Sequence, residues 1–147
     1  MPINADTESR LFHEGLDLFN HGQWFEAHEV WEDIWHLASG EKKRFYQGLI
    51  QCAVTLEHMR RGNPRGVVTV FVTANEKFRG LPDVYMGINH VRLRQAIGVM
   101  VEAIRQMPAE VFEPRAGRGL TLPIDLDQTP IITLEYDPFS PARRSEP

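Results

Sequence analysis

The sequence contains little of what secreted, membrane-spanning or nucleic-acid-binding proteins rely on. Its 147 residues include a single cysteine, Cys52, so a disulfide within the chain is excluded, which favours a reducing compartment. The longest β-branched run, Val67–Val72, is far shorter than the roughly 20 apolar residues of a membrane-spanning helix. Met1–Arg10 is polar and acidic, unlike a signal peptide. We therefore expect a cytoplasmic protein that does not contact a membrane.

Positive charge is scarce as well. Lysine and arginine number 16 against 20 aspartate and glutamate residues, which gives a formal net charge of −4. Residues 1–40 carry eight acidic side chains and one basic one, whereas residues 41–65 carry six basic and two acidic ones. The negative net charge and the lack of an aromatic and basic RNA-binding motif predict no nucleic-acid partner. These charges are interpreted as solvated faces of helices.

The composition is that of a soluble globular domain, with 42% hydrophobic, 24% charged and 10% aromatic residues. A chain of this length favours one domain. Seven of the ten prolines lie in residues 108–147. We therefore expect a helical domain over residues 1–107 and an extended tail over 108–147 that packs on it, with short extended pieces at Leu120–Leu126 and Ile131–Tyr136 and with the last ten residues frayed.

Apolar residues recur at the three- and four-residue spacing of amphipathic helices in five segments. The spacing predicts helices over about Asp6–Asn20, Gln23–Ala38, Glu41–Arg61 and Asn89–Met107, and a further one that begins at Pro64, with Asn63 as its N-cap, and ends before Gly80. The β-branched residues of that fourth segment would also suit a strand, but their spacing favours a helix. The predicted fold class is all-α: a compact bundle of about five helices with an extended Pro-rich C-terminal tail.

Aromatic residues mark the expected core. All three tryptophans lie in the second predicted helix, and we expect Trp31 and Trp35 to be largely buried. Cys52 lies on an apolar stripe and is interpreted as a packing residue. The expected surface or cap positions include four histidines: His13, His21, His36 and His90.

Apolar residues also exceed what five short helices readily cover. The third predicted helix carries two apolar stripes, and Val68 and Val72 lie outside the main stripe of the fourth. A two-fold partner would cover such faces, as would the tail. We therefore expect a homodimer.

Polar side chains line one predicted seam between the second and third helices. On a helical wheel His28 and Glu32 lie one turn apart at the edge of the tryptophan stripe. Gln47, Gln51 and His58 share a stripe of the third helix with Val54 and Arg61. A short connection makes the two helices antiparallel neighbours. We therefore predict that His28, Glu32, Gln47 and Gln51 share one interhelical polar cluster.

Three interpretations of this seam stay open. In the first, it is a satisfied polar network that fixes helix register. In the second, His28, Glu32 and His58 ligate a divalent metal, with water, Glu29 or a glutamine as fourth ligand. In the third, His28 and His58 hold an anion or act as acid and base in a small-ligand pocket. The zinc-peptidase motif H-E-x-x-H is incomplete, because Glu32 stands in place of its second histidine.

The same residues resemble a known family. The strings F-E-A-H-E-V-W-E (residues 25–32), Q-G-L-I-Q (47–51) and R-G-N-P-R-G (61–66), at these distances, are similar to the family called domain of unknown function 309. The resemblance covers about residues 10–107 and implies a small, all-helical prokaryotic protein, but no biochemical activity. The hallmark positions that match are His28, Glu29, Glu32, Gln47, Gln51 and Asn63.

Two classes of function follow from this reading. The favoured one is an uncharacterised, non-enzymatic binding or interaction module that takes a small-molecule or protein ligand at the seam, because no complete catalytic set can be assembled. The alternative is a metal-dependent, hydrolase-like enzyme centred on His28, Glu32 and His58.

Overall fold

Five α-helices make up most of the part of the chain that the structure describes. The computed structural model describes residues 3–108 and 126–140. The helices are α1 (Ala5–Asn20), α2 (Trp24–Trp35), α3 (Gly40–Arg60), α4 (Pro64–Lys77) and α5 (His90–Arg105). The remaining elements are the short strands β1 (Val84–Tyr85) and β2 (Ile88–Asn89) and the 3-10 helix η2 (Leu126–Gln128). The predicted all-α class is confirmed.

Local signals in the sequence set the ends of these helices. Asn63 caps α4 as predicted, since its side chain accepts a hydrogen bond from the Gly66 amide and Pro64 occupies the first turn. Gly22 has a φ of +75°, which suits the tight turn between α1 and α2. α2 ends at Trp35, three residues before the predicted Ala38, and His36 and Leu37 form a turn that leads toward α3.

The segment between α4 and α5 contains a small hairpin that the spacing of apolar residues does not predict. β1 and β2 are antiparallel, with Val84 opposite Asn89 and Tyr85 opposite Ile88. The two residues between the strands, Met86 and Gly87, have φ values of 51° and 78°. Positive φ at both turn positions is the conformation that matches the twist of a two-residue hairpin. Strands of two residues are too short to show an alternating pattern in the sequence.

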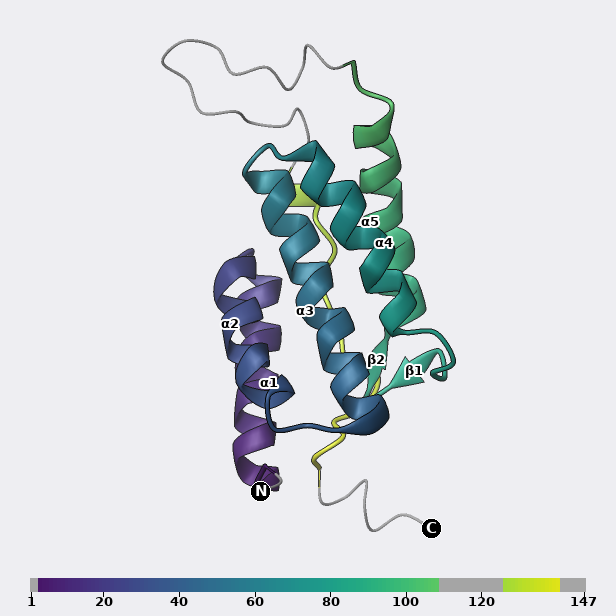
Figure 1. The fold of residues 1–147 in the computed structure, drawn as a ribbon. Coiled ribbons are helices and arrows are strands. Elements are labelled where there is room, and N and C mark those ends of the chain that lie inside the picture. The colour runs from purple at the N-terminus through teal and green to yellow at the C-terminus, as the bar shows by residue number, and fades with distance from the viewer. Residues whose placement is uncertain (1–2, 109–125, 141–147) are drawn as a thin grey trace.

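Helix α3 lies in the middle of the molecule. The α1–α2 pair packs on one side of it, and the α4–α5 pair lies on the other, with α4 packed directly on α3 (Figure 1). This position explains the two apolar stripes of α3, because each stripe meets a different neighbour. The core residues that α3 contributes are Phe45, Tyr46, Leu49, Ile50, Cys52, Ala53, Leu56 and Met59.

The described part of the C-terminal tail lies against the helices (Figure 1). Asn20 of α1 hydrogen-bonds twice to the Ile132 backbone, at 2.7 and 2.9 Å, and the Glu135 amide donates to the Gly87 carbonyl at 2.7 Å. Ile132 is buried and covers part of the core in cis. Residues 109–125 and 141–147, with most of the predicted Leu120–Leu126 piece and of the expected frayed end, lie outside the described residues. Self-association stays a prediction.

None of the described helices is both long enough and apolar enough to cross a membrane.

The tryptophans are buried to different extents. Trp24 and Trp31 are 1% and 0% exposed, as expected for core residues. Trp35 is less completely buried than the other two but packs against the core, with its indole nitrogen buried. It is the last residue of α2, and the ammonium group of Lys43 lies 4.5 Å from the centre of its ring. A cation with a flexible stem therefore covers part of the ring that the core leaves accessible.

His90 was expected at the surface or at a cap, and the structure corrects the first alternative. It is the first residue of α5 and is 1% exposed. Its ring stacks on Phe78 with 4.8 Å between the ring centres. Nε2 donates to the Pro82 carbonyl at 2.7 Å, and Nδ1 accepts from Arg94 at 3.0 Å. The ring is therefore a neutral imidazole with both nitrogens in use.

We expect His90 to make the fold weaker in mild acid. Burial lowers the pKa of His90 from its usual value of 6.5; the hydrogen bond to the Pro82 carbonyl opposes this effect, and the Arg94 charge adds to it. Below about pH 6.5 the unfolded chain therefore binds a proton at His90 that the folded chain does not bind. The stabilisation that neutral His90 gives the fold above that pH is lost as the pH falls. Urea unfolding from pH 7.5 to 5 should show the stability advantage of the wild type over His90→Gln shrinking with falling pH. Parallel profiles for the two proteins would contradict this assignment.

Candidate functional site

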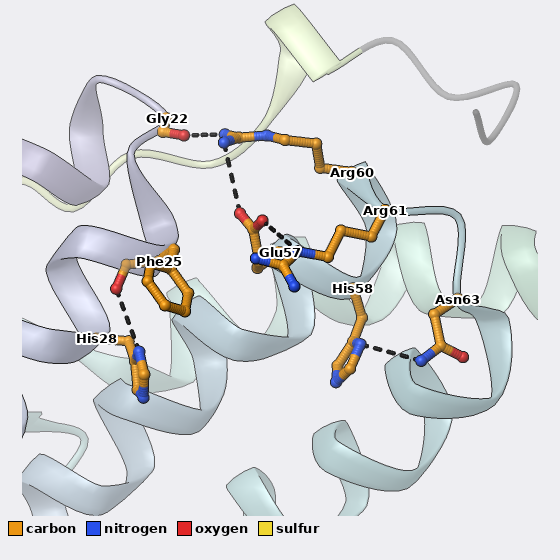
Figure 2. A network of polar contacts seen from close by, with 8 residues as sticks. All are labelled: Gly22, Phe25, His28, Glu57, His58, Arg60, Arg61 and Asn63. Atoms are coloured by element: carbon orange, nitrogen blue, oxygen red, sulfur yellow. Dashed lines mark hydrogen bonds and ion pairs between the residues drawn. The ribbon is translucent and has the colours of Figure 1, made fainter. Parts of the chain in front are cut away.

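A groove of about 200 Å³ opens between α2 and the C-terminal end of α3. Its lining residues are Phe25, His28, Val54, Glu57, His58 and Arg61. We call it the α2–α3 groove. Figure 2 shows His28 and His58 reaching toward it from different helices, with the Glu57 and Arg61 side chains between them. The groove thus contains two of the seven residues predicted for the site.

His28 is held along the surface of α2. Its Nε2 lies 2.9 Å from Glu32 Oε1, one turn away, and its Nδ1 lies 3.1 Å from the Phe25 carbonyl oxygen. Both ring nitrogens therefore face acceptors, so contacts within α2 occupy both of them.

His58 is held by the cap of the next helix. The Oδ1 atom of Asn63 accepts from the Gly66 amide at 3.1 Å, which fixes the side-chain amide with its Nδ2 toward His58 Nδ1, 3.2 Å away. Because Asn63 Nδ2 can only donate, His58 Nδ1 is the acceptor and the ring proton sits on Nε2. A Cβ atom on residue 66 would come within 2.7 Å of the His58 ring, so Gly66 gives the ring its room.

Glu57 pairs with two arginines: Arg61, which lines the groove with it, and Arg60, which lines a separate pocket beside Gly22 and Trp24. Its Oε2 accepts from Arg61 Nε at 2.8 Å, and its Oε1 lies 3.4 Å from Arg60 Nη1. Arg60 also donates to the Gly22 carbonyl (Figure 2) and lies 4.4 Å above the Trp24 ring, while Arg61 lies 5.5 Å from the Phe25 ring centre. Two guanidinium groups against one carboxylate leave one positive charge beside Glu57.

Sequence reasoning missed Phe25 and Glu57 as site residues. The i, i+3 and i, i+4 spacings of Glu57 with Arg60 and Arg61 were the available signal, because such pairs meet on one face of a helix. Phe25 is 42% exposed, and nothing in its spacing distinguishes it from a solvated helix position.

The other predicted residues lie apart from the groove lining. Glu29 is exposed and, together with Glu32, faces an acidic depression between α1 and α2. Gln47 is partly buried, and the buried Gln51 Oε1 has no hydrogen-bond partner among the described residues. No hydrogen bond within residues 3–108 joins either glutamine to His28 or Glu32. The predicted four-residue polar network is therefore reduced to the His28–Glu32 pair.

The metal interpretation finds no support in this arrangement. Nowhere in the described ranges do three or more histidine, cysteine, aspartate or glutamate side chains group so that they could hold a metal ion. His28 directs Nε2 at Glu32, and His58 directs Nδ1 at Asn63, so the bonds that hold these rings are made within the protein. The predicted set of His28, Glu32 and His58 is not a preformed ligand cluster.

Comparison with known proteins finds relatives whose function is not described. The chain is 34% identical over 93 residues to an uncharacterized protein of Aquifex aeolicus, covering 63% of this chain and 28% of that protein. It is 32% identical over 91 residues to the uncharacterized protein YpuF of Bacillus subtilis, covering 58% of this chain and 51% of YpuF. The chain thus spans about a quarter of the first relative and about half of the second. Residues 12–70, which include all of the α2–α3 groove, match the model of the family described as Domain of unknown function (DUF309), which confirms the resemblance noted in the sequence.

Proposed function

We propose that this protein is a non-enzymatic binding module and that the α2–α3 groove is its ligand site. The observation that carries the proposal is the convergence of His58 and Arg61 with the apolar side chains of Phe25 and Val54 on one groove. Binding sites are typically concave and largely apolar, with a few polar groups that orient the ligand. At about 200 Å³ the groove is smaller than the roughly 300–1,000 Å³ of drug-sized pockets, so it suits a small ligand.

The surrounding chemistry favours binding over catalysis. His28 faces an acceptor at each ring nitrogen, and Glu57 is ion-paired with two arginines, so both side chains are held by contacts within the protein. The chain's one thiol, Cys52, is fully buried, and burial raises its pKa to about 12, so it does not form the thiolate that a nucleophile requires. The residues of the groove therefore present donors and apolar surface rather than a reactive pair.

Filling the groove should abolish binding. Val54→Trp places a large side chain in the groove, and Val72→Trp makes the same chemical change on α4, where Val72 is 53% exposed and lines no part of the groove. We expect small fragments, screened by saturation-transfer NMR, to bind the wild type and to shift the amide signals of Phe25, Val54 and His58. Val54→Trp should lose these fragments, and Val72→Trp should retain them. Fragments that map to another surface, or that still bind Val54→Trp, would refute the proposal.

A further inference from the structure

We propose that the α2–α3 groove selects a small monocarboxylate with a short apolar body, such as a branched short-chain acid. This inference rests on the proposed function and names the chemical class of its ligand. Three features of the groove carry it: a hydrogen-bond donor of fixed tautomer, one uncompensated positive charge, and an apolar wall of limited size.

The donor is His58 Nε2. The Asn63 amide, itself fixed by capping α4, occupies His58 Nδ1 at 3.2 Å and so holds the proton on Nε2. Among the described residues Nε2 has no hydrogen-bond partner of its own. A fixed N–H that lines a groove calls for an acceptor on the ligand, and a carboxylate oxygen makes the stronger, charge-assisted bond.

The charge comes from the arginine pair. Arg60 and Arg61 share the single carboxylate of Glu57, whose side chain is 12% exposed. The hydrogen bond between Arg61 and Glu57 uses Nε, and Arg61 keeps its two terminal nitrogens for a ligand. The excess of guanidinium over carboxylate beside Glu57, together with the terminal nitrogens of Arg61, favours a ligand with one negative charge.

The apolar wall limits the size of the ligand. Phe25 and Val54 form it, and the groove of about 200 Å³ accommodates a short aliphatic body. Beyond the groove α2 exposes Glu26, Glu29 and Asp33. An acidic peptide that extended along α2 would meet these carboxylates, whereas a free acid contained in the groove would not. The charge pattern therefore favours a small molecule over a protein terminus.

Isovalerate and isovaleramide test the inference, because they share one shape and differ in charge. In two-dimensional NMR titrations of the full chain, we expect isovalerate to bind with a dissociation constant on the order of millimolar, as suits a ligand of few atoms. It should shift the signals of Phe25, Val54 and His58. Isovaleramide should bind at least about tenfold more weakly.

The variants separate the donor from the shape of the ring. His58→Phe keeps a ring but removes the donor, and we expect about a tenfold loss of isovalerate affinity with little loss for isovaleramide. His58→Gln places an amide N–H near the Nε2 position and should recover part of that loss. Nitrogen-15 spectra of the histidine rings should show His58 protonated on Nε2, and a proton on Nδ1 instead would refute the donor assignment. Circular dichroism melting checks that each variant is folded.

The outcomes distinguish this inference from the proposed function. Equal affinity for the acid and the amide would overturn carboxylate selection but leave the groove a binding site. Tighter binding of an acetylated alanine-alanine-valine peptide with a free C-terminus than of isovalerate would assign the groove to a protein terminus and overturn the small-acid inference. Absence of binding by isovalerate, when other fragments bind the groove, would overturn the inference alone. If neither isovalerate nor any fragment binds there, both proposals fail.

Discussion

Trp31→Ala should lower the free energy of unfolding by about 3–5 kcal/mol, the usual cost of removing a large buried aromatic side chain. Trp31 is 0% exposed. Its ring lies against Gly15 of α1, where a Cβ atom would overlap the indole, and 6.0 Å from the Phe19 ring centre. Its Nε1 donates to the Phe12 carbonyl at 3.4 Å. These neighbours all lie on α1, and the cost of the cavity left beside them adds to the lost transfer free energy.

Urea unfolding followed by circular dichroism measures the loss, and Trp35→Ala is the matched control. Trp35 is one helical turn away on α2 but only partly buried, so its truncation should cost clearly less. A loss of about 3–5 kcal/mol is a large fraction of the roughly 5–15 kcal/mol by which domains are stable, and it should lower Tm by roughly 10 °C. Equal losses for the two variants would show that α2 does not pack on α1 through Trp31.

The helices could be predicted because their signals are local. Spacing of apolar residues defined each one, and caps such as Asn63 and turn residues such as Gly22 set its ends within a few positions. The errors came from tertiary contacts. A helical wheel gives the direction of a side chain but not what covers it, so the wheel could not predict that Lys43 lies over the Trp35 ring. His90 was assigned to the surface or a cap although Phe78 and Arg94 enclose it.

The candidate site was predictable in part for the same reason. The wheel placed His28 and His58 on facing sides of two neighbouring helices, and the structure brings both to one groove. The wheel does not show which residues along the two helix axes lie opposite one another. His28 lies beside Val54 and His58, further toward the C-terminal end of α3 than Gln47 and Gln51. The bond from Asn63 to His58 was not predictable from the wheel either, because it depends on how the chain turns between α3 and α4.

The second large loss of stability is expected at a buried carboxylate that sequence reasoning did not single out. Glu8 of α1 is 4% exposed. Its Oε2 accepts from the Tyr46 hydroxyl at 2.6 Å, and its Oε1 lies 3.4 Å from Lys42 Nζ. Burial, and then the adjacent Glu8 carboxylate, raise the pKa of Tyr46 well above its usual range, so the hydroxyl remains a donor. This bond joins α1 to α3 through the core.

Tyr46→Phe should lower the free energy of unfolding by about 1.5–3 kcal/mol, because it removes a hydrogen bond to a charged group and leaves the buried Glu8 oxygen without its donor. Glu8→Leu should also lower the free energy of unfolding, because it leaves the buried Tyr46 hydroxyl without its acceptor and removes an acid from the first turn of α1. The double variant Glu8→Leu/Tyr46→Phe replaces both partners by apolar groups and should lose less than the sum of the single losses, by about 1 kcal/mol or more. Urea unfolding of the four proteins at pH 7 completes the cycle. The helix-dipole contribution of Glu8 is lost in both proteins that carry the Glu8→Leu substitution, so it cancels and the remainder reports the Glu8–Tyr46 bond. Strictly additive losses would mean that the two side chains do not stabilise each other and that α1 is held to α3 by apolar packing alone.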